Sequence, residues 1–130
     1  MSSKYLLQNV ELEGKVVDIA IADGLENEIG PSLSLEGATK IDGKGSVALP
    51  GLVDLHTHLR EPGKEDAETV HSGSRAGARG GFVALSAMAN TSPVADTAGV
   101  VEQVFRLGQE AGLLDVFPIG AVTQGLHGEH

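Results

Sequence analysis

The 130-residue chain contains no cysteine and no tryptophan, and it has few basic residues. Without cysteine there is no disulfide, no thiolate nucleophile and no cysteine-bound zinc. The chain has nine Lys and Arg residues and eighteen Asp and Glu residues, which gives a formal net charge of −9. The chain therefore lacks the cationic surface that binds nucleic-acid phosphates, and we expect no nucleic-acid partner.

Long apolar runs are also missing. No segment approaches the roughly 20 apolar residues of a membrane helix. The first residues, Met1-Ser2-Ser3-Lys4-Tyr5, lack the basic and then apolar pattern of a signal peptide. These absences predict a soluble, cytoplasmic chain with no membrane partner.

Glycine, by contrast, is abundant, with 18 of 130 residues, roughly twice the usual ~7%. The glycines lie between apolar segments, which indicates tight turns and close helix–strand contacts. In the first fifty residues, turn residues separate short β-rich segments at 5–10, 16–22 and 46–49. We predict that residues 1–50 form a small β-sandwich module.

After Pro50-Gly51 the pattern changes to apolar strands that alternate with helices. We predict strands over 53–58, 82–88 and 115–122, with a first helix over 67–79. A second helix is expected to begin at Asp96 or Thr97 and to stop at Gly112. The predominantly acidic residues Lys64-Glu65-Asp66 and Glu68 are expected at the first helix's start, where the carboxylates favour its dipole. This order, with short connections, predicts an α/β fold with a parallel sheet covered by helices.

The segment DLHTHLREPG, residues 54–63, carries the clearest chemical signal. Because side chains alternate along a strand, we expect Asp54, His56 and His58 to share one face. The apolar residues between them would then face the helices. Two neutral imidazoles at the carboxyl end of a parallel strand suit Zn²⁺ or a similar ion.

The other histidines give weaker signals. His71 is expected to be an exposed histidine of the first helix. The segment His127-Gly128-Glu129-His130 resembles a metal-binding run, but we expect it to be a flexible end. Neither is therefore predicted to bind metal.

These motifs together resemble a known family. The chain is similar to the amidohydrolase superfamily over essentially its whole length, and within it to the dihydroorotases, which are cyclic amide hydrolases. The resemblance rests on the segments Val16–Ile21, Gly30-Pro31, Ile41–Gly45, Leu49–Gly63 and Met88–Pro93. Two departures are Ala89, where many relatives have proline, and the less regular stretch from Gly24 to Ile29.

The resemblance implies a (β/α)₈ barrel, of which residues 51–130 would form the first three strands, beside the module of residues 1–50. It implies that His56 and His58 bind one zinc ion of a pair, although another divalent metal would also suit them. Asp54 would orient a ligand imidazole or a nearby polar group. Arg60 and Asn90 would hold the carboxylate of the substrate, which His58 would also contact.

The implied reaction is the reversible hydrolysis of dihydroorotate to N-carbamoyl-aspartate, a step of pyrimidine biosynthesis. No catalytic residue is expected within residues 1–130, because the remaining ligands and the catalytic aspartate would lie beyond His130. We therefore expect an N-terminal portion that is inactive alone. The full-length protein would be a homodimer, with aspartate transcarbamoylase as a further candidate partner.

Three alternatives stay open. The first is another cyclic amide hydrolase of the allantoinase, hydantoinase or dihydropyrimidinase type. Arg60 argues against it, because those substrates lack the ring carboxylate that Arg60 would bind. The second is a non-catalytic dihydroorotase-like subunit that supports aspartate transcarbamoylase. The third is an unrelated His-x-His metallophosphatase, which the β-module disfavours.

Overall fold

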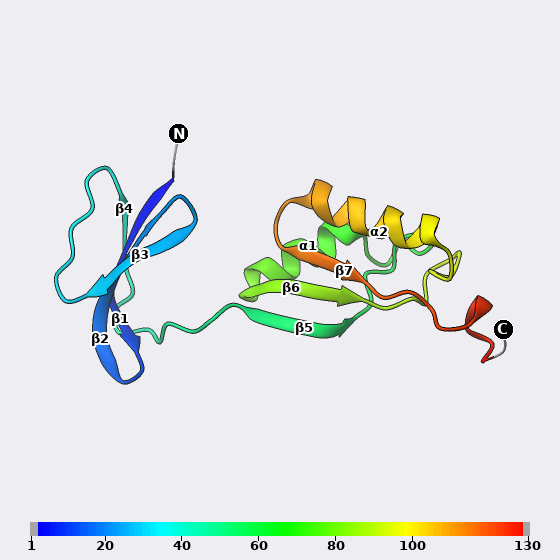
Figure 1. Ribbon diagram of the computed structural model, residues 1–130, viewed down its shortest axis with the longest axis horizontal. Coiled ribbons are helices and arrows are strands. Elements are labelled where there is room, and N and C mark those ends of the chain that lie inside the picture. Colours follow the sequence, from blue (N-terminus) through cyan, green and yellow to red (C-terminus); the bar gives the residue numbers. More distant parts are fainter. Residues whose placement is uncertain (1–2, 129–130) are drawn as a thin grey trace. The chain divides into compact units, whose positions relative to one another are not determined.

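The computed structural model describes residues 3–128, and the chain divides into two compact units, Met1–Pro50 and Gly51–His130. Figure 1 shows the elements of each unit. Within residues 3–128, no helix combines the length and the hydropathy that crossing a membrane requires.

The first unit is one four-stranded sheet with the order β3-β2-β1-β4. Its strands are β1 (Lys4–Leu12), β2 (Lys15–Ala22), β3 (Leu25–Gly30) and β4 (Thr39–Asp42). The first three strands pair antiparallel, whereas β4 runs parallel to β1. A sandwich of two sheets remains a prediction, since the described residues of this unit form a single sheet.

Two tight hairpins build that sheet. Residue pairs 13–14 and 23–24 connect the strands, and all four residues have positive φ. This is the conformation of the two-residue turns that match the right-handed twist of a hairpin. The strands predicted over 5–10 and 16–22 are confirmed as parts of β1 and β2.

The strand predicted over 46–49 was wrong, because only Val47 forms a single bridge, with Glu11. Two strands, β3 and β4, were not predicted. Nearly all their side chains are exposed, so they show no alternation of apolar and polar residues. Their backbone pairing with β2 and β1 forms them instead.

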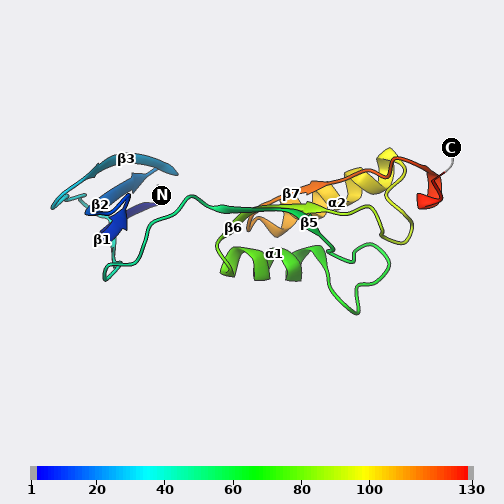
Figure 2. The same ribbon diagram turned by 90° about the horizontal axis from the view of Figure 1, so that it is seen from below.

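The second unit alternates strands and helices (Figures 1 and 2). Its elements are β5 (Leu52–Thr57), α1 (Val70–Arg79), β6 (Phe82–Ala87), α2 (Ala98–Ala111), β7 (Asp115–Pro118) and a short 3₁₀ turn, η1 (Gln124–Leu126). The sheet order β5-β6-β7, parallel throughout, confirms the three adjacent parallel strands predicted from the sequence. The third strand is shorter than predicted and ends at Pro118 instead of residue 122.

One apolar core joins the helices to a single face of this sheet. The core consists of Leu59, Val70, Leu85, Ala87, Val104 and Val116. Glycines permit the close approach: a Cβ at Gly73 would lie 2.5 Å from Leu59, and one at Gly77 would lie 2.9 Å from Leu114. These contacts confirm that the small residues of the first helix pack tightly. The hydroxyl of Ser74 is fully buried there and has no hydrogen-bond partner in the described chain.

The first helix begins later than predicted, at Val70 instead of residue 67. Thr69 is its N-cap, and Thr69 and Ser72 form a reciprocal capping box. Each side chain accepts a hydrogen bond from the other residue's backbone N–H, which would otherwise have no partner in the helix. The first turn contains no acidic residue, so the prediction that residues 64–66 and 68 begin the helix was wrong. Instead, Glu61 accepts a hydrogen bond of 2.7 Å from the backbone N–H of Val70.

The second helix has the predicted limits. Thr97 is its N-cap, although its side chain makes no capping hydrogen bond, and Gly112 ends the helix with a φ of 61°. Asp96, the alternative cap, accepts a hydrogen bond from the backbone N–H of Gly125 instead. Asp96 therefore fixes the segment after β7 and does not cap the helix.

Candidate metal centre

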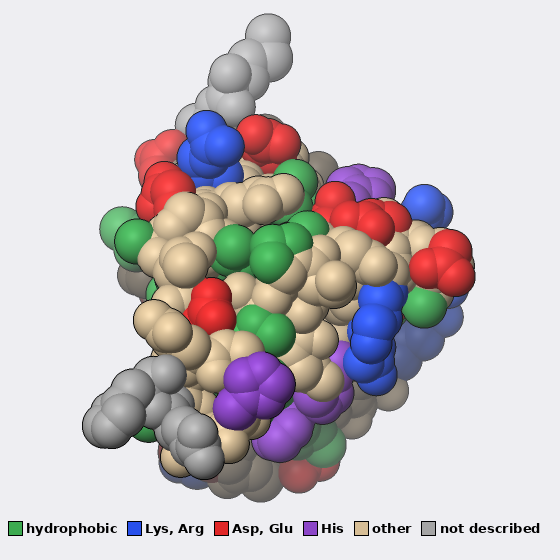
Figure 3. Space-filling model, turned by 90° about the vertical axis from the view of Figure 1, so that its right-hand side faces the viewer, with side chains coloured by type: hydrophobic (Ala, Val, Ile, Leu, Met, Phe, Trp, Pro, Cys, Tyr) green, Lys and Arg blue, Asp and Glu red, His purple; other side chains and the backbone are tan. Residues whose placement is uncertain are grey.

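His56 and His58 lie next to each other where β5 ends. Their ring centroids are 5.2 Å apart, and the ring planes make an angle of 63°. A zinc–nitrogen distance of about 2.0–2.1 Å places the metal about 3 Å from each ring centre, so two rings on one tetrahedral ion lie about 5 Å apart. The spacing of the two imidazoles therefore fits a single shared ion. Histidine side chains gather on one part of the face shown in Figure 3.

A bulge in β5 produces this arrangement. The pairing of β5 with β6 passes from Asp54↔Leu85 directly to Thr57↔Ala87, so β5 has one residue more than β6 between these two pairs. Since Leu85 and Ala87 belong to the helix-covered core, Asp54 and Thr57 lie on that face. The prediction that Asp54 shares a face with both histidines was therefore wrong, because it assumed an uninterrupted strand.

The apolar residues of β5 also differ from expectation. Val53 is 55% exposed and Leu55 is 72% exposed, so the described helices do not cover them. The Asp54 carboxylate accepts a hydrogen bond of 3.0 Å from the backbone N–H of His56. Asp54 thus holds the backbone of the bulge and not an imidazole ring. Aspartate often bonds the backbone two residues ahead, and this tendency was the signal in the sequence that could have indicated the contact.

Asn90 reaches the histidine pair from the loop after β6. Its Oδ1 lies 2.8 Å from Nδ1 of His58. The carboxyl ends of parallel strands meet at one edge of a sheet, and this brings two residues 32 positions apart into contact. The sequence predicted Asn90 at this site, but not its hydrogen bond to His58.

Arg60 lies on a tightly bonded loop directly after the histidine pair. Its backbone has a φ of 61°, which is uncommon for a residue other than glycine. No hydrogen bond or ion pair joins its guanidinium to another residue of the described ranges. The neighbouring carboxylates are engaged elsewhere: Glu61 binds the Val70 amide, and Glu65 accepts a hydrogen bond of 2.7 Å from Gly63. That bond from the Gly63 amide lowers the pKa of Glu65.

The loops after β5 and β6 are joined to each other. The backbone N–H of Ser92 donates a hydrogen bond of 2.9 Å to the carbonyl of Pro62. Gly63 has a φ of +101°, and a Cβ there would collide with the backbone oxygen of Ser92. This contact requires glycine, and it fixes the loop that carries Arg60 against the loop that carries Asn90.

The remaining histidines lie apart from this arrangement. His71 is exposed on α1, as predicted, and His127 is exposed after η1. Residues 129 and 130, part of the predicted flexible end, lie outside the described residues. Across residues 3–128, no group of three or more His, Asp or Glu side chains is placed to hold a metal ion. The described chain therefore offers two candidate metal ligands, fewer than the three protein ligands of a catalytic zinc site.

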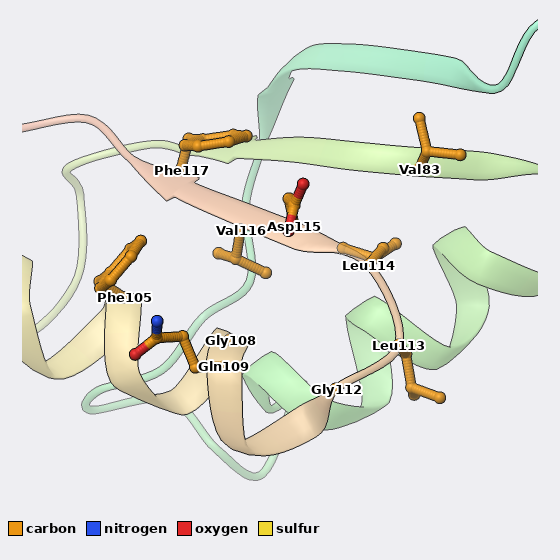
Figure 4. Close-up of a pocket in the computed structure, with 10 residues that line it drawn as sticks. All are labelled: Val83, Phe105, Gly108, Gln109, Gly112, Leu113, Leu114, Asp115, Val116 and Phe117. Carbon is orange, nitrogen blue, oxygen red and sulfur yellow. The ribbon is translucent and has the colours of Figure 1, made fainter. Parts of the chain in front are cut away.

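A groove in the second unit lies away from the histidines. It has a volume of about 630 Å³ and lies beside α2 and β7. In Figure 4, Val116 points toward α2, whereas Asp115 and Phe117 point to the opposite face of β7. The groove offers mainly apolar side chains and no pair of titratable groups, so we assign the chemistry to the strand ends instead.

Solved hydantoinases share this fold. L-Hydantoinase (dihydropyrimidinase) from Arthrobacter aurescens matches with a TM-score of 0.74 at 23% identity, over 93% of this chain and 28% of that protein. D-Hydantoinase from Bacillus sp. AR9 matches with a TM-score of 0.64 at 25% identity, over 88% of this chain and 26% of that protein. The architecture is therefore of the amidohydrolase type.

Sequence comparison specifies the family. The model of the dihydro-orotase-like family matches residues 45–130. The chain is 59% identical to the dihydroorotase of Streptomyces coelicolor over 127 residues, 97% of this chain and 30% of that protein. It is 55% identical to the dihydroorotase of Mycobacterium tuberculosis over 117 residues, 89% of this chain and 27% of that protein. The chain belongs to the dihydro-orotase-like family, and it spans about 30% of the length of the curated relatives it matches.

Proposed function

We propose that this chain forms part of a dihydroorotase, in which His56 and His58 bind a divalent metal ion. Zinc is the metal we propose first. The observation that carries the proposal is the pair of imidazole rings 5.2 Å apart at the end of β5, in a chain of the dihydro-orotase-like family. Because the described residues offer only two ligands, groups from outside these 130 residues would complete the site.

Each residue of the site has a distinct proposed task. His56 and His58 hold the ion, and Asp54 fixes the bulge that places His56 beside His58. When bound, the metal supplies a Lewis acid and lowers the pKa of a bound water. In the proposed reaction, water adds across the ring amide C–N bond of dihydroorotate to give N-carbamoyl-aspartate, and the reverse reaction closes the ring.

Arg60 and Asn90 are proposed to bind the carboxylate of dihydroorotate, a group that His58 would also contact. The guanidinium of Arg60 has five N–H donors and no partner in the described chain, so it is available to an anionic ligand. This unpaired guanidinium supports a binding role instead of a structural one.

A second candidate is a hydantoinase-like cyclic amide hydrolase, which the structural similarity to hydantoinases favours. The unpaired Arg60 favours dihydroorotate, because it would have no carboxylate partner on an uncharged cyclic amide. A non-catalytic dihydroorotase-like subunit is the third candidate. The predicted homodimer, the aspartate transcarbamoylase partner, the cytoplasmic location and the (β/α)₈ barrel belong to this proposal as well.

A chimeric enzyme tests the function. The segment of Streptomyces coelicolor dihydroorotase that matches this chain is replaced by this chain, and the purified chimera is assayed for dihydroorotate hydrolysis and metal content. We expect activity in the chimera and none in the isolated 130 residues, which lack a complete ligand set.

The histidine pair is tested in the same chimera. Replacing both His56 and His58 by Ala should remove bound metal and activity together, because each ring supplies one metal ligand. His71→Ala, which changes an exposed histidine of α1, is the matched control and should change neither. Full metal content in the double variant would refute the ligand assignment, and an inactive chimera with full metal content would favour the non-catalytic subunit.

A further inference from the structure

The contact between His58 and Asn90 restricts the chemistry of the histidine ring. A neutral imidazole carries its proton on one nitrogen and leaves a lone pair on the other. An amide oxygen has no proton to donate, so the Oδ1 of Asn90, 2.8 Å away, is paired only when Nδ1 of His58 carries the hydrogen. The lone pair of that ring is then on Nε2.

We propose that Asn90 is a positioning residue that holds His58 in its Nδ1–H tautomer and thereby presents the Nε2 lone pair to the metal. This inference rests on the proposed function, in which His58 is a metal ligand. Histidine ligands commonly donate their second N–H to an oxygen, which sets the tautomer and the ring orientation. In this chain, that oxygen belongs to an amide side chain from the neighbouring strand's loop.

The backbone around Asn90 is fixed on both sides. Ala89 is buried, and its carbonyl accepts a hydrogen bond of 3.0 Å from the backbone N–H of Ala95. On the other side, Ser92 is bonded to Pro62 of the loop after β5. The backbone on both sides of Asn90 is therefore held before any ligand binds.

The amide nitrogen of Asn90 has no partner in the described part of the chain. Its two N–H groups are available to an acceptor while Oδ1 remains bonded to His58. The same side chain can thus serve the metal ligand with its oxygen and a substrate carboxylate with its nitrogen. This division of tasks predicts that aspartate at position 90 preserves the first role and abolishes the second.

Nitrogen-15 NMR of the histidine rings tests the tautomer directly. The chimera is labelled at histidine and freed of metal, at a pH where the imidazoles are neutral, and the signals of His58 and His71 are assigned from variants that lack each ring. We expect His58 to show a protonated Nδ1 and an unprotonated Nε2. His71, which is exposed on α1, serves as the reference ring in the same spectrum. A protonated Nε2 on His58 of the unaltered chain would overturn the proposal without any variant.

Two variants then separate the roles. Asn90→Leu, which has similar volume and no acceptor, should abolish the Nδ1–H preference of His58 and leave His71 unchanged. Asn90→Asp should retain the preference. In zinc titrations of the metal-free chimera, the Leu variant should bind roughly 10- to 100-fold more weakly, whereas the Asp variant should not. An unchanged His58 tautomer in the Leu variant would contradict the inference.

The outcomes distinguish this inference from the proposed function. If the chimera hydrolyses dihydroorotate and His58 nevertheless carries its proton on Nε2, only the role of Asn90 fails. If His58 has the expected tautomer but the chimera is inactive, the proposed function fails and the positioning contact stands. In an active chimera, Asn90→Asp should retain the metal and lose activity on dihydroorotate, because its carboxylate repels that of the substrate.

Discussion

Arg60 is the residue whose replacement most sharply separates the candidate substrates. In the chimera, Arg60→Met should retain the metal but lose most of its kcat/KM for dihydroorotate. Loss of one partner of a charged hydrogen-bonded pair costs about 2–5 kcal/mol, which is roughly a 30- to several-thousand-fold effect. Activity on dihydrouracil, which has no carboxylate, should change far less. The measurement is kcat/KM for both substrates, together with metal content.

Arg79 provides the matched control for this substitution. It is an exposed arginine in the last turn of α1, so Arg79→Met removes the same charge away from the strand ends and should leave both activities unchanged. An equal loss on both substrates in Arg60→Met would mean that Arg60 stabilises its loop and does not select the substrate. The dihydroorotate proposal would then lose its main discriminating residue.

The sequence predicted which residues gather at the candidate site, but not all of their contacts. The His-x-His spacing and the strand before it predict that the two rings lie together, whereas their role as metal ligands stays a prediction. The face of Asp54 was not predictable, because the β5 bulge depends on how β6 pairs beside it. The bond from Asn90 to His58 depends on the folded course of two loops 32 residues apart. Residue type therefore indicated the chemistry, while tertiary pairing determined which atoms meet.

At the scale of elements, the predictions failed where side-chain pattern carries no information. The parallel strands and α2 were predictable because their apolar residues repeat at strand or helix spacing. Strand β3 has almost entirely exposed side chains, so only its hydrogen bonds to β2 define it. The start of α1 was missed because the Thr69–Ser72 capping box uses residues that also occur in loops.

The packing of α2 on β7 yields a prediction with an internal control. A Cβ added at Gly108 would lie 2.5 Å from the Cβ of Val116. Gly108→Ala should therefore destabilise the chain by about 1–3 kcal/mol, the usual effect of overpacking a core. Gly99 lies in the same helix with nothing within 4 Å of an added Cβ. Gly99→Ala should stabilise the helix by about 0.5–1 kcal/mol.

Urea unfolding followed by circular dichroism measures both variants. Opposite signs are expected, because both replacements add the same methyl group and only Gly108 lacks the space for it. If Gly108→Ala were as stable as Gly99→Ala, α2 would not pack closely on β7. Since the strand ends are held by the same layer, the position of the candidate metal centre relative to α2 would then need revision.

At the scale of the whole chain, the sheet of the second unit has two edge strands, β5 and β7, and one face that the described helices of this unit do not cover. Val53, Leu55, Val83 and Phe117 are each more than half exposed. Unpaired strand edges and exposed apolar faces favour association with another chain. Relatives of this family are about three times as long as the matched segment, and we infer that their additional residues cover the equivalent surface.

We therefore predict that the isolated 130-residue chain self-associates through the sheet of its second unit. Sedimentation velocity over a concentration series should show species larger than the 13.4 kDa monomer, because apolar surface removed from water stabilises the associated form. Phe117→Lys, which places a charge on the uncovered face, should shift the chain toward monomer. Val16→Lys removes a similarly exposed side chain (65%, against 52% for Phe117) from the first unit and should not shift the chain toward monomer.

A monomeric chain with a cooperative thermal transition would contradict this prediction, because it would show that the three-stranded sheet is stable with one face exposed. An equal effect of both substitutions would mean that net charge, and not the sheet of the second unit, controls the association.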